Sequence, residues 1–379
     1  MKRVVCFALA LLLLGGGRAW AETPESGLSV SAPSAILMEK ETGTVLFAKN
    51  AEEPGFPASV TKIMTMLLII EAMESGAVSA DDIVTASARA ASFGGSCVYL
   101  EQGEQMSVRD MLKCIAVVSA NDCAVAMAEY LCGTEEVFVR RMNERAKELG
   151  LKNTHFSNCT GLFDDGEHFT TAYDVALMSR ELICHEGIKE YTGIWMDSIR
   201  DGSFELANTN KLVYWYPGCT GLKTGFTSEA MYCLSASAER DGVEYIAVIM
   251  HGDSIESRNA DAKALLNYAF ANFTLAPLPA DDELPEVSVA YGVRASVPLT
   301  LEDGCRSLLV PKGGGDCAFA YSLSASLNAP LRKGEEAGEL IVTRGDAEIA
   351  RRTLVVAQDV ERIGFWGILG RLAGSLVGL

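Results

Sequence analysis

The sequence predicts a mixed α/β fold, with helices packed on an antiparallel sheet, followed by a small all-β domain and a C-terminal amphipathic helix. Two observations predict it. Strand-like segments occur at both ends of roughly the first 270 residues and enclose helical ones. Beyond residue 285 the helical patterns stop, and short apolar segments alternate with Gly and charged turns. A chain of 379 residues that is 49% apolar is long enough for two domains with their own cores.

The first residues predict export. Lys2 and Arg3 precede the apolar run Val4–Leu14, and the small residues Ala19 and Ala21 follow. This order of charge, short apolar run and small residues is typical of a signal peptide, which we place at residues 1–21. An uncleaved N-terminal anchor is the alternative, but the apolar run is short for crossing a bilayer. We therefore expect an exported protein outside the cytoplasm.

The next segments predict a catalytic domain over residues 28–274. Ala35–Met38 and Val45–Ala48 flank a turn and predict a hairpin. Ala58–Ser75 is apolar nearly all round, which predicts a buried helix. The remaining expected elements are helices at 108–149 and 172–190, strands at 206–212, 232–238 and 244–251, and a closing helix at 261–273.

The last hundred residues carry three further expectations. Leu275–Pro285 holds three prolines and three acids and is interpreted as a linker. Residues 284–353 are predicted to form the small all-β domain. Residues 360–379 are apolar with few charges, and a helix lying in the membrane interface with Trp366 as anchor fits them better than a spanning helix. A helix docked on the β-domain is the alternative.

Composition excludes some functions. A net charge of −18 argues against nucleic acid as a partner, because phosphates demand clustered Lys and Arg. Ten cysteines remain after the predicted signal peptide, at irregular spacings, and we favour free buried thiols over disulfides. The four histidines are scattered without a metal-binding motif, so no metal site is expected.

Ser59 and Lys62 form the first of three motifs that point to chemistry. Ser59 follows Pro57 near the first turn of the predicted helix, where free backbone N–H groups and the helix dipole favour developing negative charge. Lys62, three residues on, lies on the same helical face and can serve as the base that a serine nucleophile needs, provided its pKa is lowered. Taken alone, Ser59 would be better explained as an ordinary helix cap.

Ser119 and Asn121 form the second motif, between two apolar helical runs. In a turn, side chains two residues apart can both reach a cleft. Ser119 could then relay a proton and Asn121 could hold a substrate amide. Helix capping is the alternative for both residues.

Lys223-Thr224-Gly225 is the third motif and is expected at the start of a strand. Lys223 and Thr224 could bind a substrate carboxylate, and Gly225 would let a ligand lie against the strand. The backbone N–H groups of Phe226 and Ser59 could form an oxyanion hole. Lys223 could also supply the second cation that lowers the pKa of Lys62.

In this order the three motifs match those of penicillin-binding proteins and serine β-lactamases. Phe56–Thr65, Asn153–Leu162 with Thr170–Asp174, and Gly221–Ala230 resemble segments of the low-molecular-mass penicillin-binding proteins, the serine D-alanyl-D-alanine carboxypeptidases. The resemblance implies a β-lactamase/transpeptidase-like domain and a role for Arg258 in binding the terminal carboxylate.

The same resemblance implies the reaction and the partners. The terminal D-alanine of peptidoglycan stem pentapeptides would be removed through an acyl-enzyme on Ser59, with no cofactor or metal. β-Lactams would acylate Ser59 as covalent inhibitors, and the C-terminal helix would hold the protein peripherally on the outer face of the cytoplasmic membrane. DD-endopeptidase or transpeptidase activity, a serine β-lactamase and a catalytically silent sensor of β-lactams or peptidoglycan remain as alternatives.

Overall fold

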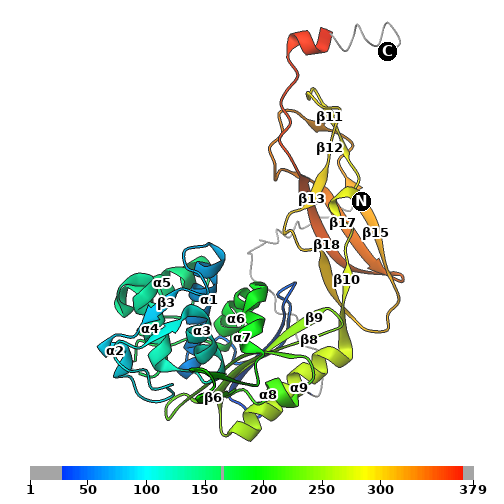
Figure 1. The fold of residues 1–379 in the computed structure, drawn as a ribbon. Helices are drawn as coiled ribbons and strands as arrows, with labels where there is room; N and C mark the ends of the chain where they lie inside the picture. The colour runs from blue at the N-terminus through cyan, green and yellow to red at the C-terminus, as the bar shows by residue number, and fades with distance from the viewer. Residues whose placement is uncertain (1–27, 164–165, 370–379) are drawn as a thin grey trace, which may run out of the picture.

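The computed structural model describes residues 28–163 and 166–369 (Figure 1). The predicted signal peptide and residues 370–379 of the predicted anchor lie outside the described residues. Residues 28–272, here called the α/β region, contain one five-stranded sheet with helices on both faces. Residues 273–362, here called the all-β region, extend away from it toward the C-terminus. The predicted fold class is confirmed.

The central sheet has the order β2-β1-β9-β8-β7, and every neighbouring pair is antiparallel. The predicted hairpin is present, with Ile36 opposite Ala48 on one side and Val248 on the other. Strand β7 is an edge strand, so only one of its sides pairs with another strand of this sheet. The bounds are β1 Ser34–Glu39, β2 Val45–Lys49, β7 Cys219–Thr227, β8 Met231–Arg240 and β9 Val243–Gly252.

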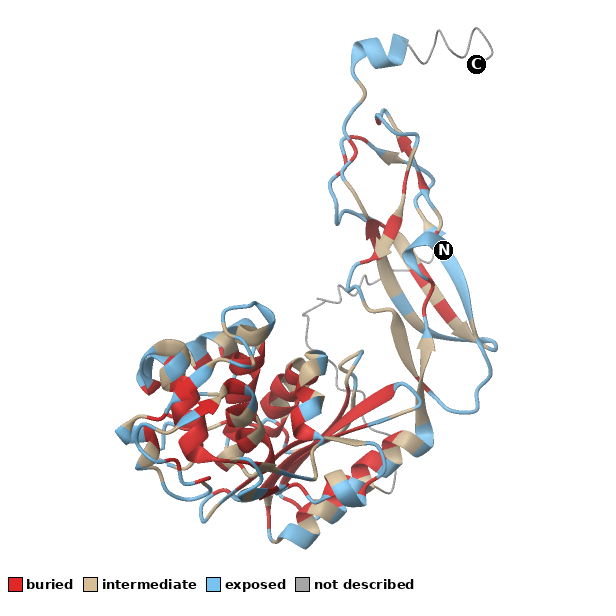
Figure 2. Cartoon of the chain, in the orientation of Figure 1, coloured by how far each residue is buried: buried red, intermediate tan, exposed pale blue. Residues whose placement is uncertain are grey.

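Alternating side chains of this sheet enter two separate cores. Ile36 and Met38 face the larger core, whereas Ala35 and Leu37 face the smaller one beneath α9, as period-two alternation requires. Figure 2 shows the buried residues concentrated on the inner sides of these layers. The larger core is built from α1 Lys62–Glu74, α3 Val108–Val117, α4 Asn121–Cys132, α5 Glu135–Glu148 and α6 Ala172–Cys184.

Helix α1 confirms the prediction of a buried helix, because its first nine residues, 62–70, are all buried. Helix α9, Ile255–Asn272, begins six residues before the predicted start. Ser254 and Ser257 form a capping box there, which satisfies the free N–H groups of the first turn. Short elements complete the region: β3 Ile83–Thr85, α2 Ala88–Ala91, β4 Gln105–Ser107, α7 Lys189–Thr192, β5 Met196–Ile199, β6 Phe204–Ala207 and α8 Leu212–Trp215.

The strand predicted at 206–212 is mostly wrong. Strand β6 ends at Ala207, and the following residues form a loop whose asparagine side chains bond to the backbone. Asn208 Nδ2 donates to Ile194 O at 2.7 Å, and Asn210 Nδ2 donates to Gly221 O at 2.8 Å. Such side chain–backbone bonds offer the chain an alternative to a strand ladder.

The linker interpretation of 275–285 is also wrong. Residues 273–277 form strand β10, which pairs antiparallel with β14, and Leu278 and Leu284 lie in the aliphatic core of the all-β region. That region contains the sheets β12-β11-β16 and β13-β18-β17-β15. Its strands are β10 Phe273–Pro277, β11 Val287–Ala290, β12 Ser296–Val297, β13 Leu299–Leu301, β14 Ser307–Pro311, β15 Cys317–Leu323, β16 Leu327–Asn328, β17 Glu336–Arg344 and β18 Ala347–Val356.

Two further expectations concern cysteines and the C-terminal segment. The ten cysteines within the described ranges are all free. Residues 365–369 are helical, and Phe365 and Trp366 are exposed. None of the helices in residues 28–163 and 166–369 has the length and apolar character needed to cross a membrane.

Candidate active site

Ser59 lies in a 3₁₀ turn, Ala58–Thr61, that leads directly into α1. Lys62 is the first residue of α1, so the three-residue spacing places it one turn from Ser59. Lys62 Nζ lies 3.0 Å from Ser59 Oγ. The pair that the sequence predicts is therefore in hydrogen-bond contact.

The ammonium group of Lys62 is held by two further acceptors. Nζ donates to Asn121 Oδ1 at 2.6 Å and to the backbone oxygen of Thr160 at 2.8 Å. The side chain is completely buried, and this burial lowers the pKa of Lys62 to about 7, against smaller raising effects from Cys159, Cys97 and Asp122. Lys62 can therefore be neutral near physiological pH, which a general base requires.

The second motif occupies the turn between α3 and α4. Ser119 has φ 63°, a left-handed conformation that is uncommon for a residue with a side chain. Its Oγ is buried and makes no hydrogen bond within the described residues. Asn121 Nδ2 donates to Gly94 O at 2.8 Å, which orients its Oδ1 toward Lys62. Ser119 is thus a buried hydroxyl with unused hydrogen-bonding capacity, and such groups call for an explanation.

The third motif lies in the interior of β7 and not at its start. Lys223 is 1% exposed, and its pKa is lowered well below its usual value by burial first, then by the charges of Lys62 and Arg258. Burial, and not Lys223, is the main cause of the low pKa of Lys62.

Gly225 brings β7 against the nucleophile. A Cβ atom at this position would lie 2.8 Å from Pro57 O and 3.1 Å from Ser59 N, so a side chain would force the strand away from the 3₁₀ turn. Phe226 follows on the same strand and is exposed. The absence of a side chain at Gly225 therefore lets the backbone of β7 lie close to the backbone N–H group of Ser59.

Thr224 and Arg258 complete the set of predicted residues. Thr224 Oγ1 donates to Thr209 Oγ1 at 2.8 Å. Arg258, in the first turns of α9, is 3% exposed and donates to Cys233 O; its burial lowers its pKa to about 10. Arg258 keeps its charge at neutral pH, and together with the buried amine of Lys223 it offers a site that suits a carboxylate.

Two contributors were not identified as site residues. The Thr160 carbonyl that binds Lys62 is presented by a turn in which Asn158 Oδ1 accepts from Thr160 N and Gly161 N. Thr209, which bonds to Thr224, lies in the region predicted as a strand. In the sequence, Asn153–Leu162 stands out only because it resembles a segment of the penicillin-binding proteins. The role of the Thr160 carbonyl cannot be predicted from residue types, because every residue carries a backbone oxygen.

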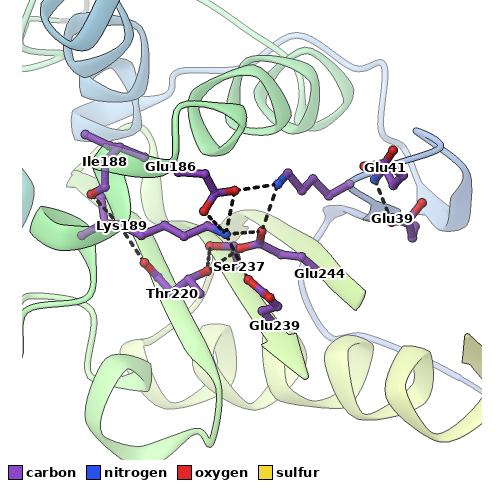
Figure 3. A network of polar contacts seen from close by, with 11 residues as sticks. Glu39, Glu41, Glu186, Ile188, Lys189, Thr220, Ser237, Glu239 and Glu244 are labelled. Carbon is purple, nitrogen blue, oxygen red and sulfur yellow. Dashed lines mark hydrogen bonds and ion pairs between the residues drawn. The ribbon is translucent and has the colours of Figure 1, made fainter. Parts of the chain in front are cut away.

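A polar network around the buried Glu244 supports β7 before the third motif (Figure 3). Thr220 Oγ1 donates to Glu244 Oε1 at 2.7 Å, and Glu244 Oε2 pairs with Lys189 Nζ at 3.0 Å. Burial lowers the pKa of Lys189, but its bonds to Glu244 and Glu239 outweigh burial, and the pKa is raised. These contacts anchor the strand three residues from Lys223.

Comparisons with known proteins agree with this geometry. Residues 20–254 match the family model described as D-alanyl-D-alanine carboxypeptidase, and residues 274–362 match that of the penicillin-binding protein 5 C-terminal domain. The D-alanyl-D-alanine carboxypeptidase DacF of Bacillus subtilis is 42% identical over 356 residues, covering 92% of this chain and 91% of DacF.

Solved structures give the same result. Penicillin-binding protein 5 from Haemophilus influenzae superposes with a TM-score of 0.80 at 31% identity, covering 88% of this chain and 98% of that protein. Penicillin-binding protein D2 from Listeria monocytogenes, in its ampicillin-bound form, has a TM-score of 0.59 at 33% identity, covering 64% of this chain and 99% of that one.

Proposed function

The chain belongs to the D-alanyl-D-alanine carboxypeptidase family, and we propose that it removes the terminal D-alanine of peptidoglycan stem pentapeptides through an acyl-enzyme on Ser59. The observation that carries this proposal is the contact of 3.0 Å between Ser59 Oγ and the completely buried Nζ of Lys62, whose pKa is about 7. A serine hydroxyl with such a base is an activated nucleophile.

The acceptors around Lys62 explain how it would act as a base. A neutral amine has two N–H bonds and one lone pair. The oxygens of Asn121 and Thr160 can each accept one N–H, which leaves the lone pair for the hydroxyl proton of Ser59. Neutral Lys62 is therefore oriented for proton abstraction before substrate arrives.

The acylation step follows from this arrangement. Ser59 Oγ attacks the carbonyl of the terminal D-Ala–D-Ala bond and gives its proton to Lys62. The backbone N–H groups of Ser59 and Phe226 stabilise the oxyanion. The C–N bond then breaks, and the leaving D-alanine amine takes a proton, which the buried hydroxyl of Ser119 relays from Lys62. Attack by water on the ester, again assisted by Lys62, regenerates Ser59.

Recognition of the substrate would use the polar side chains buried along β7 and α9. Lys223, Thr224 and Arg258 bind the terminal carboxylate, and desolvation strengthens each of these interactions. Gly225 leaves room for the peptide beside β7. β-Lactams, which carry a carboxylate and a reactive amide, would enter by the same contacts and acylate Ser59.

Export and membrane attachment are part of the proposal. The N-terminal sequence supports a cleaved signal peptide, and the exposed Phe365 and Trp366 support an amphipathic helix on the outer face of the cytoplasmic membrane. Removal of residues 363–379 should release soluble, active enzyme. Persistent membrane binding of the truncated protein would contradict the anchor.

The decisive experiment measures D-alanine release from a purified pentapeptide by the mature protein, with Ser59→Ala as control. One D-alanine per peptide, lost in the variant, is the expected result. If no D-alanine appears while a fluorescent penicillin still labels Ser59, the activity is that of a transpeptidase, an endopeptidase or a sensor instead.

A further inference from the structure

Three aromatic side chains form a small surface outside the catalytic residues, here called the aromatic patch: Trp195, Tyr214 and Trp215. The rings of Trp195 and Tyr214 lie 5.2 Å apart, and those of Tyr214 and Trp215 lie 4.7 Å apart at 89°. Tyr214 is 58% exposed and Trp215 is 68% exposed. Rings that pack on one another and still face solvent are a marker of binding.

The patch is connected to the active site by a short segment of chain. Thr209, which bonds to Thr224 of the third motif, lies five residues before Tyr214. The Cα atoms of Thr209 and Tyr214 can therefore be at most about 18 Å apart. Trp195, the third member of the patch, is held to the same segment because Asn208 N donates to Trp195 O at 2.9 Å. An extended pentapeptide has a similar reach, about 17 Å.

Charge limits what the patch can bind. The chain has a net charge of −18, and stem peptides end in carboxylates, so long-range electrostatics do not attract the polymer. Attachment to a cell-wall polymer needs contacts that do not depend on charge. Sugar rings offer flat faces of C–H groups, and the negative face of an aromatic ring attracts such groups.

We propose that the aromatic patch binds the glycan strand that carries, or neighbours, the stem peptide undergoing cleavage. This rests on the proposed function, since it makes the polymer, and not a free peptide, the preferred substrate. Tyr214 and Trp215 meet at a right angle, so one ring stacks on a sugar face while the other borders the sugar edge.

The test compares D-alanine release from intact peptidoglycan with release from a free pentapeptide. In Trp215→Ala the ratio of the two rates should fall about tenfold, which is the loss of one stacking contact. Trp215→Phe should restore most of the ratio. Tyr291→Ala, which removes a ring that is 60% exposed in the all-β region, is the matched control and should leave the ratio unchanged.

A second measurement separates this inference from the proposed function. Peptide-free glycan strands should quench the tryptophan fluorescence of the wild-type protein and of Tyr291→Ala, and quench Trp215→Ala much less. This readout does not need turnover, so it holds even if the wild type releases no D-alanine. An unchanged ratio in Trp215→Ala, or no binding of glycan by the wild type, would overturn the assignment and leave the patch to a protein partner. Tyr214→Ser serves if Trp215→Ala does not fold.

Discussion

The two regions of this molecule differ most in what they bury. The α/β region buries charged side chains, among them Glu39, Lys62, Lys223, Glu244 and Arg258. In the described part of the all-β region every buried side chain is apolar, and its core is aliphatic, without an aromatic ring. A buried charge costs several kcal/mol unless it is compensated, so stability alone does not explain its presence.

The buried charges of the α/β region fall into two groups. Glu39 and Glu244 are compensated by hydrogen bonds and ion pairs, which is a structural solution. Lys62 and Lys223 are instead buried amines, and burial is the main cause that lowers the pKa of each. Perturbed groups of this kind cluster at functional sites. The predictions below test this contrast, beginning with the largest effect.

Lys62→Met should have the largest effect. It keeps the length of the side chain but removes the base, so the rate of acylation by a fluorescent penicillin should fall by about 10²–10⁴-fold. Thermal stability should be retained, because a buried amine is replaced by an apolar group. Rapid acylation of the variant would show that Lys62 is not the base.

The candidate residues could be predicted from the sequence because their chemistry depends on side-chain type. Ser59, Lys62, Ser119, Asn121 and Lys223 were all predicted, and the structure brings Ser59, Lys62 and Asn121 into contact. The carbonyl of Thr160 was missed, because every residue carries one and only the fold decides which is aimed at Lys62.

The errors in the fold have a similar origin. Leu275–Pro285 was interpreted as a linker because prolines and acids dominate its composition, yet Leu275 pairs with Leu309. Pairing with a partner more than thirty residues away cannot be deduced from the segment itself. The hairpin at Ser34–Lys49 was predicted correctly because both of its strands and its turn lie within one short segment.

Gly161→Ala should have the next largest effect. A Cβ atom at Gly161 would lie 1.8 Å from Ala58 O, so the turn that presents Thr160 must move against the residue before Ser59. A displacement of about 1 Å at a catalytic group can cost about 10²-fold in rate. Gly150→Ala is the matched control, because Gly150 has the same φ of +71° and open space around it. Equal acylation rates in the two variants would exclude this steric role.

The change of the acylation rate with pH should be smaller than the effect of either substitution. Because the pKa of Lys62 is lowered to about 7, the amine is mostly protonated at pH 6 and mostly neutral at pH 8. Only the neutral amine accepts the Ser59 proton, so the acylation rate should rise about tenfold between these values and then level off. A rate that is constant from pH 6 to pH 8 would contradict the assignment.

The smallest effect on chemistry is expected in the all-β region. Leu340 is completely buried in its aliphatic core, and Leu340→Ala should lower the free energy of unfolding of that region by about 2–5 kcal/mol. The acylation rate of Ser59 should stay the same, because no described charge of the active site contacts this core. Thermal unfolding and penicillin labelling of one sample measure both quantities. If acylation slows in proportion to the loss of stability, the two regions are coupled, and the division between a reactive and an inert core no longer holds.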